Sequence, residues 1–175
     1  MLEGDLLNEE TCGAERTKQE EVLVMGIEAP GCPQEDTGTR EFNEALVDLG
    51  CSATVAGKEW VREFEAKSGG TVEWFSTARR AFTGFTGEQA SSDQATTLHV
   101  RVLGGYGKLL VHVLDTATPL LLSRLSMARL GLVIDVSERS VQSKLSNRML
   151  VCRREGHFKI PLEGTEAQAP LQTKD

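Results

Sequence analysis

The segment Thr96–Asp115, TTLHVRVLGGYGKLLVHVLD, constrains the fold more than any other part of the chain. Apolar residues alternate with mostly polar ones over 98–102 and again over 109–113, and Gly104-Gly105 lies between the two runs. Alternation is typical of a strand with one buried face, and a Gly pair permits the tight turn that joins two such strands. The segment therefore predicts a β-hairpin that supplies part of the core.

Most of the remaining elements are also β-prone. The runs EALVDLG, SATVAG, TVEWFST, LVIDV and RMLVCRREGHFKIPL all predict strands. Lys58–Gly70 carries apolar residues at helical spacing and ends in Gly-Gly, which favours a helix that stops there. Thr118–Gly131 begins as an apolar strand and continues as a short helix, in which Leu125, Met127 and Leu130 are expected to pack. A mostly β chain with closely spaced Gly turns favours a small closed β-barrel with one or two short helices.

A second hairpin is predicted around Gly84 and Gly87, which lie between β-prone flanks. Its Gly residues favour a mobile tip. His99 and His112 occupy polar positions of the first hairpin, so both are expected at the surface.

Charge divides the chain into unequal parts. Residues 1–45 carry three basic and twelve acidic residues, whereas residues 46–175 carry sixteen basic and fourteen acidic ones. An acidic segment punctuated by Gly and Pro does not bury enough apolar surface to offset its ordering entropy. We therefore predict a largely disordered acidic linker over 1–43, with a possible strand at Glu20–Glu28, a folded domain over 44–162 and a disordered tail over 163–175.

Several function classes are disfavoured by composition. No apolar run is long enough to span a membrane, the N-terminus lacks the pattern of a signal peptide, and nothing is basic enough to suggest nucleic-acid binding. The four cysteines are scattered without the spacing of a zinc site, so we expect reduced thiols and no metal. The prediction is an intracellular, cytoplasmic protein without a cofactor.

The order of four motifs resembles the retropepsin family, the aspartic proteases of retroviral and retrotransposon polyproteins. The motifs are ALVDLGCSATVAG, FTGFTGE, PLLLSRLSMARLGLVID and GHFKIPL, and together they cover about Glu44 to Leu162. They correspond to an apolar strand that enters an Asp-x-Gly turn, a Gly-rich flap, an apolar strand that enters a short helix, and a closing strand. The resemblance implies a retropepsin-type barrel, a homodimer, and an extended peptide or polyprotein as substrate.

The resemblance also implies roles for individual residues. Asp48 from each of two chains would be the catalytic pair that activates water. The other implied site residues are the active-site loop Leu49, Gly50, Cys51 and Ser52, the flap residues Phe82, Gly84, Phe85 and Gly87, and the loop brace Arg124, whose partner position is Ser52.

One departure from the family pattern concerns the catalytic turn. Family members have Thr or Ser between Asp and Gly, where this chain has Leu49, so the hydroxyl that bonds across the dimer is lost. A literal Asp-Thr-Gly occurs at Asp36–Gly38, but no apolar strand precedes it, and a linker turn explains it. Two readings follow: an aspartic endopeptidase, or a catalytically impaired remnant that dimerises or binds peptides.

Simpler explanations compete with these assignments. Asp48 also fits a plain turn former, and the whole chain also fits an unrelated small β-barrel adaptor. A triad of Cys51 or Ser52 with His157 has no oriented third partner, and a lone His is more often structural. The paired arginines Arg79-Arg80 and Arg153-Arg154 are expected to be solvated.

Overall fold

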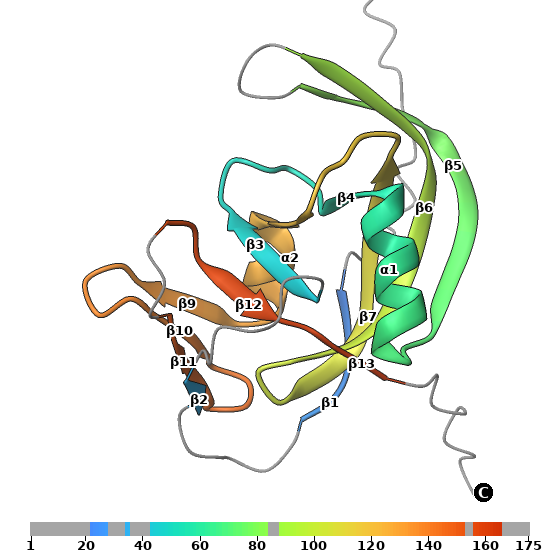
Figure 1. The fold of residues 1–175 in the computed structure, drawn as a ribbon. Helices are drawn as coiled ribbons and strands as arrows, with labels where there is room; N and C mark the ends of the chain where they lie inside the picture. Colours follow the sequence, from blue (N-terminus) through green and yellow to red (C-terminus); the bar gives the residue numbers. More distant parts are fainter. Residues whose placement is uncertain (1–21, 28–33, 36–42, 84–87, 153–155, 166–175) are drawn as a thin grey trace, which may run out of the picture.

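The computed structural model describes residues 22–27, 34–35, 43–83, 88–152 and 156–165 (Figure 1). This part of the chain is mostly β with two α-helices, as the sequence predicts. The helices are α1 (Lys58–Ser68) and α2 (Arg124–Arg129). The strands are β1 (Val22–Ile27), β2 (Gln34–Glu35), β3 (Glu44–Asp48), β4 (Val55–Gly57), β5 (Val72–Thr83), β6 (Gln89–Val102), β7 (Gly105–Leu114), β8 (Leu120–Ser123), β9 (Leu132–Asp135), β10 (Ser140–Ser143), β11 (Met149–Val151), β12 (Lys159–Pro161) and β13 (Glu163–Gly164).

The larger sheet has nine strands, with the order β12-β3-β8-β4-β7-β6-β13 along its main path. The strand β1 also pairs with β7, next to the part of β7 that pairs with β4. Likewise, β5 pairs with β6, next to the part of β6 that pairs with β13. The strands β3 and β4 follow each other in the chain but lie on opposite sides of β8. The turn between them therefore crosses the end of β8, where α2 begins.

The expected closed barrel is wrong, because the sheets are open. The end strands β12 and β13 are successive short segments of one stretch, and they pair with different strands rather than with each other. Lys159–Pro161 pairs with β3, and Glu163–Gly164 pairs with β6. Between them the Leu162 N–H donates to Asn43 O at 2.7 Å. The two ends of the sheet are thus linked by the chain itself and not by a ladder of hydrogen bonds.

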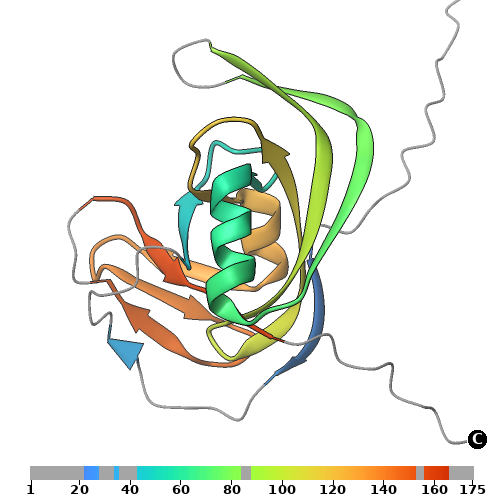
Figure 2. The ribbon, with the colours of Figure 1, turned by 45° about the vertical axis from the view of Figure 1, so that its right-hand side comes forward.

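A second sheet of four strands has the order β2-β11-β10-β9. The strands β9, β10 and β11 are antiparallel neighbours, and β2 joins β11 in parallel. Three of its strands, β9, β10 and β11, follow α2 in the chain, and the sheet lies beside β12 (Figures 1 and 2). Val141 and Leu150 of this sheet join the hydrophobic core.

The β6–β7 hairpin confirms the strongest sequence prediction. Its alternating residues are buried, with Leu98 and Val111 fully inaccessible. The turn lies one residue earlier than expected, at Leu103-Gly104, because both residues take positive φ (43° and 80°) and Gly105 already belongs to β7. Positive φ is a conformation that Gly adopts without steric cost.

The two helices pack through the residues that their spacing indicates, with one exception. Val61 and Phe64 of α1 are buried, and Gly69 ends this helix in the left-handed conformation at φ 66°. In α2 the side chain of Ser123 caps the first turn, and Met127 is buried, as is Leu130 directly after the helix. The expected packing of Leu125 is wrong, because this side chain is 46% exposed.

The predicted borders of the folded domain, at 43/44 and 162/163, lie within the described ranges, but most of the predicted linker and tail does not. The strand β1 lies within the predicted segment Glu20–Glu28, whereas most of the predicted linker 1–43 and residues 166–175 of the predicted tail are not described. Glu163 and Gly164, which the sequence predicts in the tail, form β13. No helix in the described ranges is long and apolar enough to cross a membrane.

Candidate functional site

Asp48 lies at the end of β3, where the chain turns away from the sheet. It is the last residue in register with β8, opposite Ser123. Its Oδ1 accepts the N–H of Gly50 at 2.9 Å, and its backbone oxygen accepts the N–H of Cys51 at 3.3 Å. A carboxylate that accepts the N–H two residues later forms a tight side-chain turn. The fold thus holds the Asp48 carboxylate in a fixed position at the head of the loop.

The loop after Asp48 is largely open to solvent. Leu49 is 65% exposed, Gly50 and Ser52 are exposed, and Cys51 is half-buried. An apolar side chain at this exposure loses the stabilisation that burial would give it. Leu49 therefore presents apolar surface directly beside the carboxylate.

A buried cluster of hydroxyl groups anchors this loop to α2. Thr54 Oγ1 lies 2.8 Å from Ser126 Oγ and accepts the N–H of Ser123 at 3.1 Å. Ser123 Oγ in turn donates to Ser126 Oγ at 3.2 Å, and all three side chains are fully buried. Sequence reasoning missed this cluster. Its only signal is the small polar residues that follow the apolar runs in CSAT and LLLSRLS.

Asp48 shares a sheet face with residues from three neighbouring strands. Leu46 pairs with Leu121, Leu121 with Val55, and Val55 with His112. Directly paired residues point to the same face, as do residues two apart on one strand. Asp48 comes two residues after Leu46, so its side chain belongs to the face that carries His112.

The β5–β6 hairpin arches over the loop 49–54 in both views (Figures 1 and 2). Phe82 of this hairpin contacts His112, with ring centroids 5.6 Å apart. Arg80 lies over the Phe82 ring at 5.4 Å, and its NH1 lies 3.4 Å from His112 Nε2. The hairpin is thus packed onto the face to which Asp48 belongs. The other predicted flap residues, Gly84, Phe85 and Gly87, lie outside the described residues.

Arg124 does not brace the loop through its side chain. It is the first residue of α2 and is exposed, and within the described ranges its guanidinium makes no hydrogen bond or ion pair. Only its backbone N–H reaches the loop, at 3.4 Å from Cys51 O. Ser52 offers no negative charge that would hold a guanidinium. The buried hydroxyl cluster connects the loop after Asp48 to α2 instead.

His99 is buried, with 2% of its surface exposed, so its predicted surface position is wrong. Backbone hydrogen bonds to Thr71 and Thr165 cover the strand edge around it. Its Nε2 donates to Glu73 Oε1 at 2.9 Å, and Lys108 Nζ donates to the same oxygen at 3.1 Å. The hydrogen bond from His99, followed by that from Lys108, lowers the pKa of Glu73. The half-buried His112 is also less exposed than expected.

Other kinds of site find little support among the described residues. No group of His, Cys, Asp and Glu side chains there has the arrangement of a metal site, and neither Cys51 nor Cys152 is in a disulfide there. His157 is exposed on the segment before β12.

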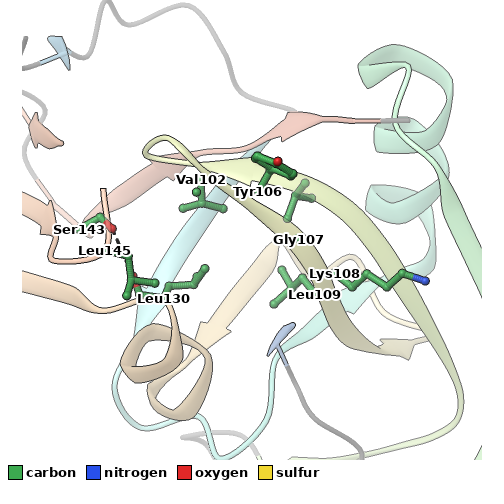
Figure 3. A pocket seen from close by; sticks show the side chains of 10 residues that line it. Val102, Tyr106, Gly107, Lys108, Leu109, Leu130, Ser143 and Leu145 are labelled. Carbon is green, nitrogen blue, oxygen red and sulfur yellow. Dashed lines mark hydrogen bonds between the residues drawn. The ribbon is translucent and has the colours of Figure 1, made fainter. Parts of the chain in front are cut away.

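A small pocket lies at the far end of the β6–β7 hairpin, next to its turn (Figure 3). None of its lining residues belongs to the loop after Asp48 or to β5. The lining is formed by Val100, Val102, Gly105, Tyr106, Gly107, Lys108, Leu109, Leu130, Ser143 and Leu145. This pocket is therefore separate from the Asp48 site.

The chain matches no family model, no curated protein and no solved structure. The Asp48 site is therefore defined by its geometry alone. It consists of a carboxylate at the head of an exposed turn, a buried cluster of hydroxyl groups and a covering hairpin.

Proposed function

We propose that the chain is an aspartic endopeptidase of the retropepsin type, from a retrotransposon polyprotein, that acts as a homodimer on extended peptide segments. The observation that carries this proposal is the position of Asp48. Its carboxylate is fixed by the Gly50 N–H at 2.9 Å, lies in an exposed turn, and belongs to the sheet face covered by the β5–β6 hairpin. The order of motifs in the sequence adds support.

One Asp48 per chain makes a second copy necessary. In the proposed dimer the two carboxylates would approach to about 3 Å, where both cannot ionise easily and one proton is shared, as is general for aspartic proteases. The ionised carboxylate would take a proton from water as the water attacks the scissile carbonyl, and the protonated one would donate to the developing oxyanion. The exposed Leu49 and Gly50 fit a surface that a second copy covers.

Leu49 favours a second candidate function, a dimerising or peptide-binding module without catalysis. The family hydroxyl would hydrogen-bond across the two-fold axis, whereas a leucine side chain only contributes apolar contact. Catalytic geometry that loosens by about an ångström loses on the order of 100-fold in rate. Both candidate functions require a dimer that binds an extended peptide, and they differ only in whether the peptide is cleaved.

A cleavage assay on the full chain separates the candidates. We expect the purified chain to sediment as a dimer and to cleave unstructured polypeptide at mildly acidic pH, with inhibition by pepstatin. Asp48→Asn is expected to abolish cleavage, whereas Asp36→Asn, in the literal Asp-Thr-Gly triplet, is the matched control and retains it. A dimer without cleavage would support the second candidate. Cleavage that survives Asp48→Asn, or a monomer at all concentrations, would refute the protease.

A further inference from the structure

Arg79 and Arg80 are consecutive residues that lie on opposite faces of the β5–β6 hairpin. The NH1 of Arg80 lies 3.4 Å from Nε2 of His112 in β7, so Arg80 belongs to the face that looks onto the sheet. Arg79 instead donates to the exposed Ser91 through Nε at 3.2 Å and NH2 at 2.9 Å. The sequence prediction that both are merely solvated does not distinguish the two side chains.

A bulge interrupts the β5–β6 pairing directly before Arg80. Ser76 pairs with Gln94 and Arg80 with Ser92, so three residues of β5 oppose the single Asp93 of β6. Bulges re-aim side chains and often occur next to functional sites. Beyond the bulge, Arg80 and Phe82 both point toward β7.

Among the described residues, the guanidinium of Arg80 is held by an aromatic ring and an imidazole rather than by a carboxylate. It lies 5.4 Å from the Phe82 ring centroid, and its NH1 lies 3.4 Å from His112 Nε2. Since arginine has only donors, His112 Nε2 is the acceptor in this contact. No carboxylate in the described part of the chain forms an ion pair with Arg80, whose side chain remains exposed. A cation fixed by an aromatic ring and an imidazole, and open to solvent, is ready to receive an anion.

The position of this cation connects it with Asp48. His112 pairs with Val55, and that row of paired residues continues through Leu121 to the face of Asp48. Figure 2 shows the β5–β6 hairpin above this part of the sheet. A peptide in extended form beneath the hairpin would therefore pass along Arg80 on its way to the carboxylate.

We propose that Arg80 is a specificity-determining residue, which selects an acidic side chain in the extended peptide bound beneath the β5–β6 hairpin. This inference rests on the proposed function, because it uses the same peptide path. Arg80 donates to the peptide carboxylate, while Phe82 and His112 hold the guanidinium in place. The paired geometry of a guanidinium and a carboxylate gives such a contact both strength and direction.

Peptide binding to the full-length Asp48→Asn chain tests the inference without turnover. The probes are fluorescent decapeptides with two central apolar residues, each carrying one Glu at a single flanking position, and their Gln twins. At one position we expect the Glu peptide to bind about tenfold more tightly than its twin, with a preference that weakens as salt is raised. Arg80→Gln is expected to bring the ratio to within about twofold, and Arg80→Lys to retain part of it. Arg79→Gln, the control on the outer face, is expected to keep the full preference.

Each outcome decides the matter. A Glu preference that persists in Arg80→Gln, an equal loss in Arg79→Gln, no position with a preference, or no peptide binding at all would overturn the inference. Cleavage of the same peptides by the unmutated chain reports separately on the proposed function. Cleavage without an Arg80-dependent preference would support the proposed protease and refute the role of Arg80 in specificity. Arg80-dependent binding without cleavage would refute the protease and support the role of Arg80.

Discussion

Thr54 and Ser126 are 72 residues apart in the chain, yet their hydroxyl oxygens lie 2.8 Å from each other in the core. This contact fixes the loop after Asp48 against the start of α2. It replaces the side-chain brace that the resemblance implies for Arg124. The position of the candidate carboxylate therefore depends on a buried polar cluster, and buried polar clusters are costly to break.

Thr54→Val tests this dependence, since valine keeps the shape and removes the hydroxyl. The N–H of Ser123 and the hydroxyl of Ser126 each lose a partner. We expect the free energy of unfolding to fall by about 1–3 kcal/mol in urea denaturation. Thr116→Val is the control, because its hydroxyl pairs with Thr118 at the surface and its loss is expected to change stability by no more than about 0.5 kcal/mol. Equal effects of the two variants would contradict the role of the cluster.

Leu49→Thr is expected to raise peptide cleavage at least about tenfold, because the threonine hydroxyl can hydrogen-bond across a two-fold axis. Leu49 is 65% exposed, so the free energy of unfolding of one subunit is expected to stay within about 0.5 kcal/mol. Val136→Thr, at the exposed turn after β9, is the control and leaves cleavage unchanged. Loss of dimer and activity in Leu49→Thr would instead mean that two leucines hold the copies together.

Glu73 gives stability a defined pH dependence. The hydrogen bonds from His99 and Lys108 lower its pKa, so its folded pKa lies below its unfolded value near 4.5. The stabilisation is fully present above the unfolded pKa and is lost as the pH falls through the folded one. Compared with Glu73→Gln, the unmutated chain should be more stable at neutral pH by less than about 1 kcal/mol, because the carboxylate is half exposed.

The two curves of unfolding free energy against pH should converge below the folded pKa of Glu73. Lys108→Met removes one of the two hydrogen-bond donors to Glu73 and should reduce the difference in part. A difference between the chain and Glu73→Gln that is the same at every pH would show that the charge of Glu73 plays no part.

Gly57→Ala should be among the most destabilising changes in the chain. A Cβ at this position would lie 2.2 Å from Thr116 O and 2.8 Å from Thr118 N, both backbone atoms. The loop after β7 and the start of α1 would have to separate, and we expect a loss of about 3 kcal/mol or more. Gly69→Ala offers a contrast, because no described atom lies within 4 Å and only its φ of 66° opposes a side chain. There we expect a loss of about 1 kcal/mol in the same denaturation experiment.

Local patterns predicted the local structure of this chain. The alternation in Thr96–Asp115 located the β6–β7 hairpin, and the Gly-Gly after Lys58–Ser68 located the end of α1, because both signals act within a few residues. The turn at Asp48 was likewise readable from its own Asp-x-Gly sequence.

Relationships between distant segments could not be read in this way. The burial of His99 results from Thr71 and Thr165, which come from elsewhere in the chain. The inward position of Arg80 is defined by its contact with His112, which lies 32 residues further along the chain. The sheet is open because β12 and β13 pair with different strands. This pairing depends on the whole assembled sheet.

The stretch 159–164 has a consequence for how the protein is made. It pairs with β3 near the start of the described domain and with β6 in the middle. A nascent chain therefore exposes two unsatisfied strand edges until residue 164 has left the ribosome, and such edges invite association with other chains. Synthesis must run past this point before the large sheet is complete, so folding of this domain does not finish until its last strands have been made.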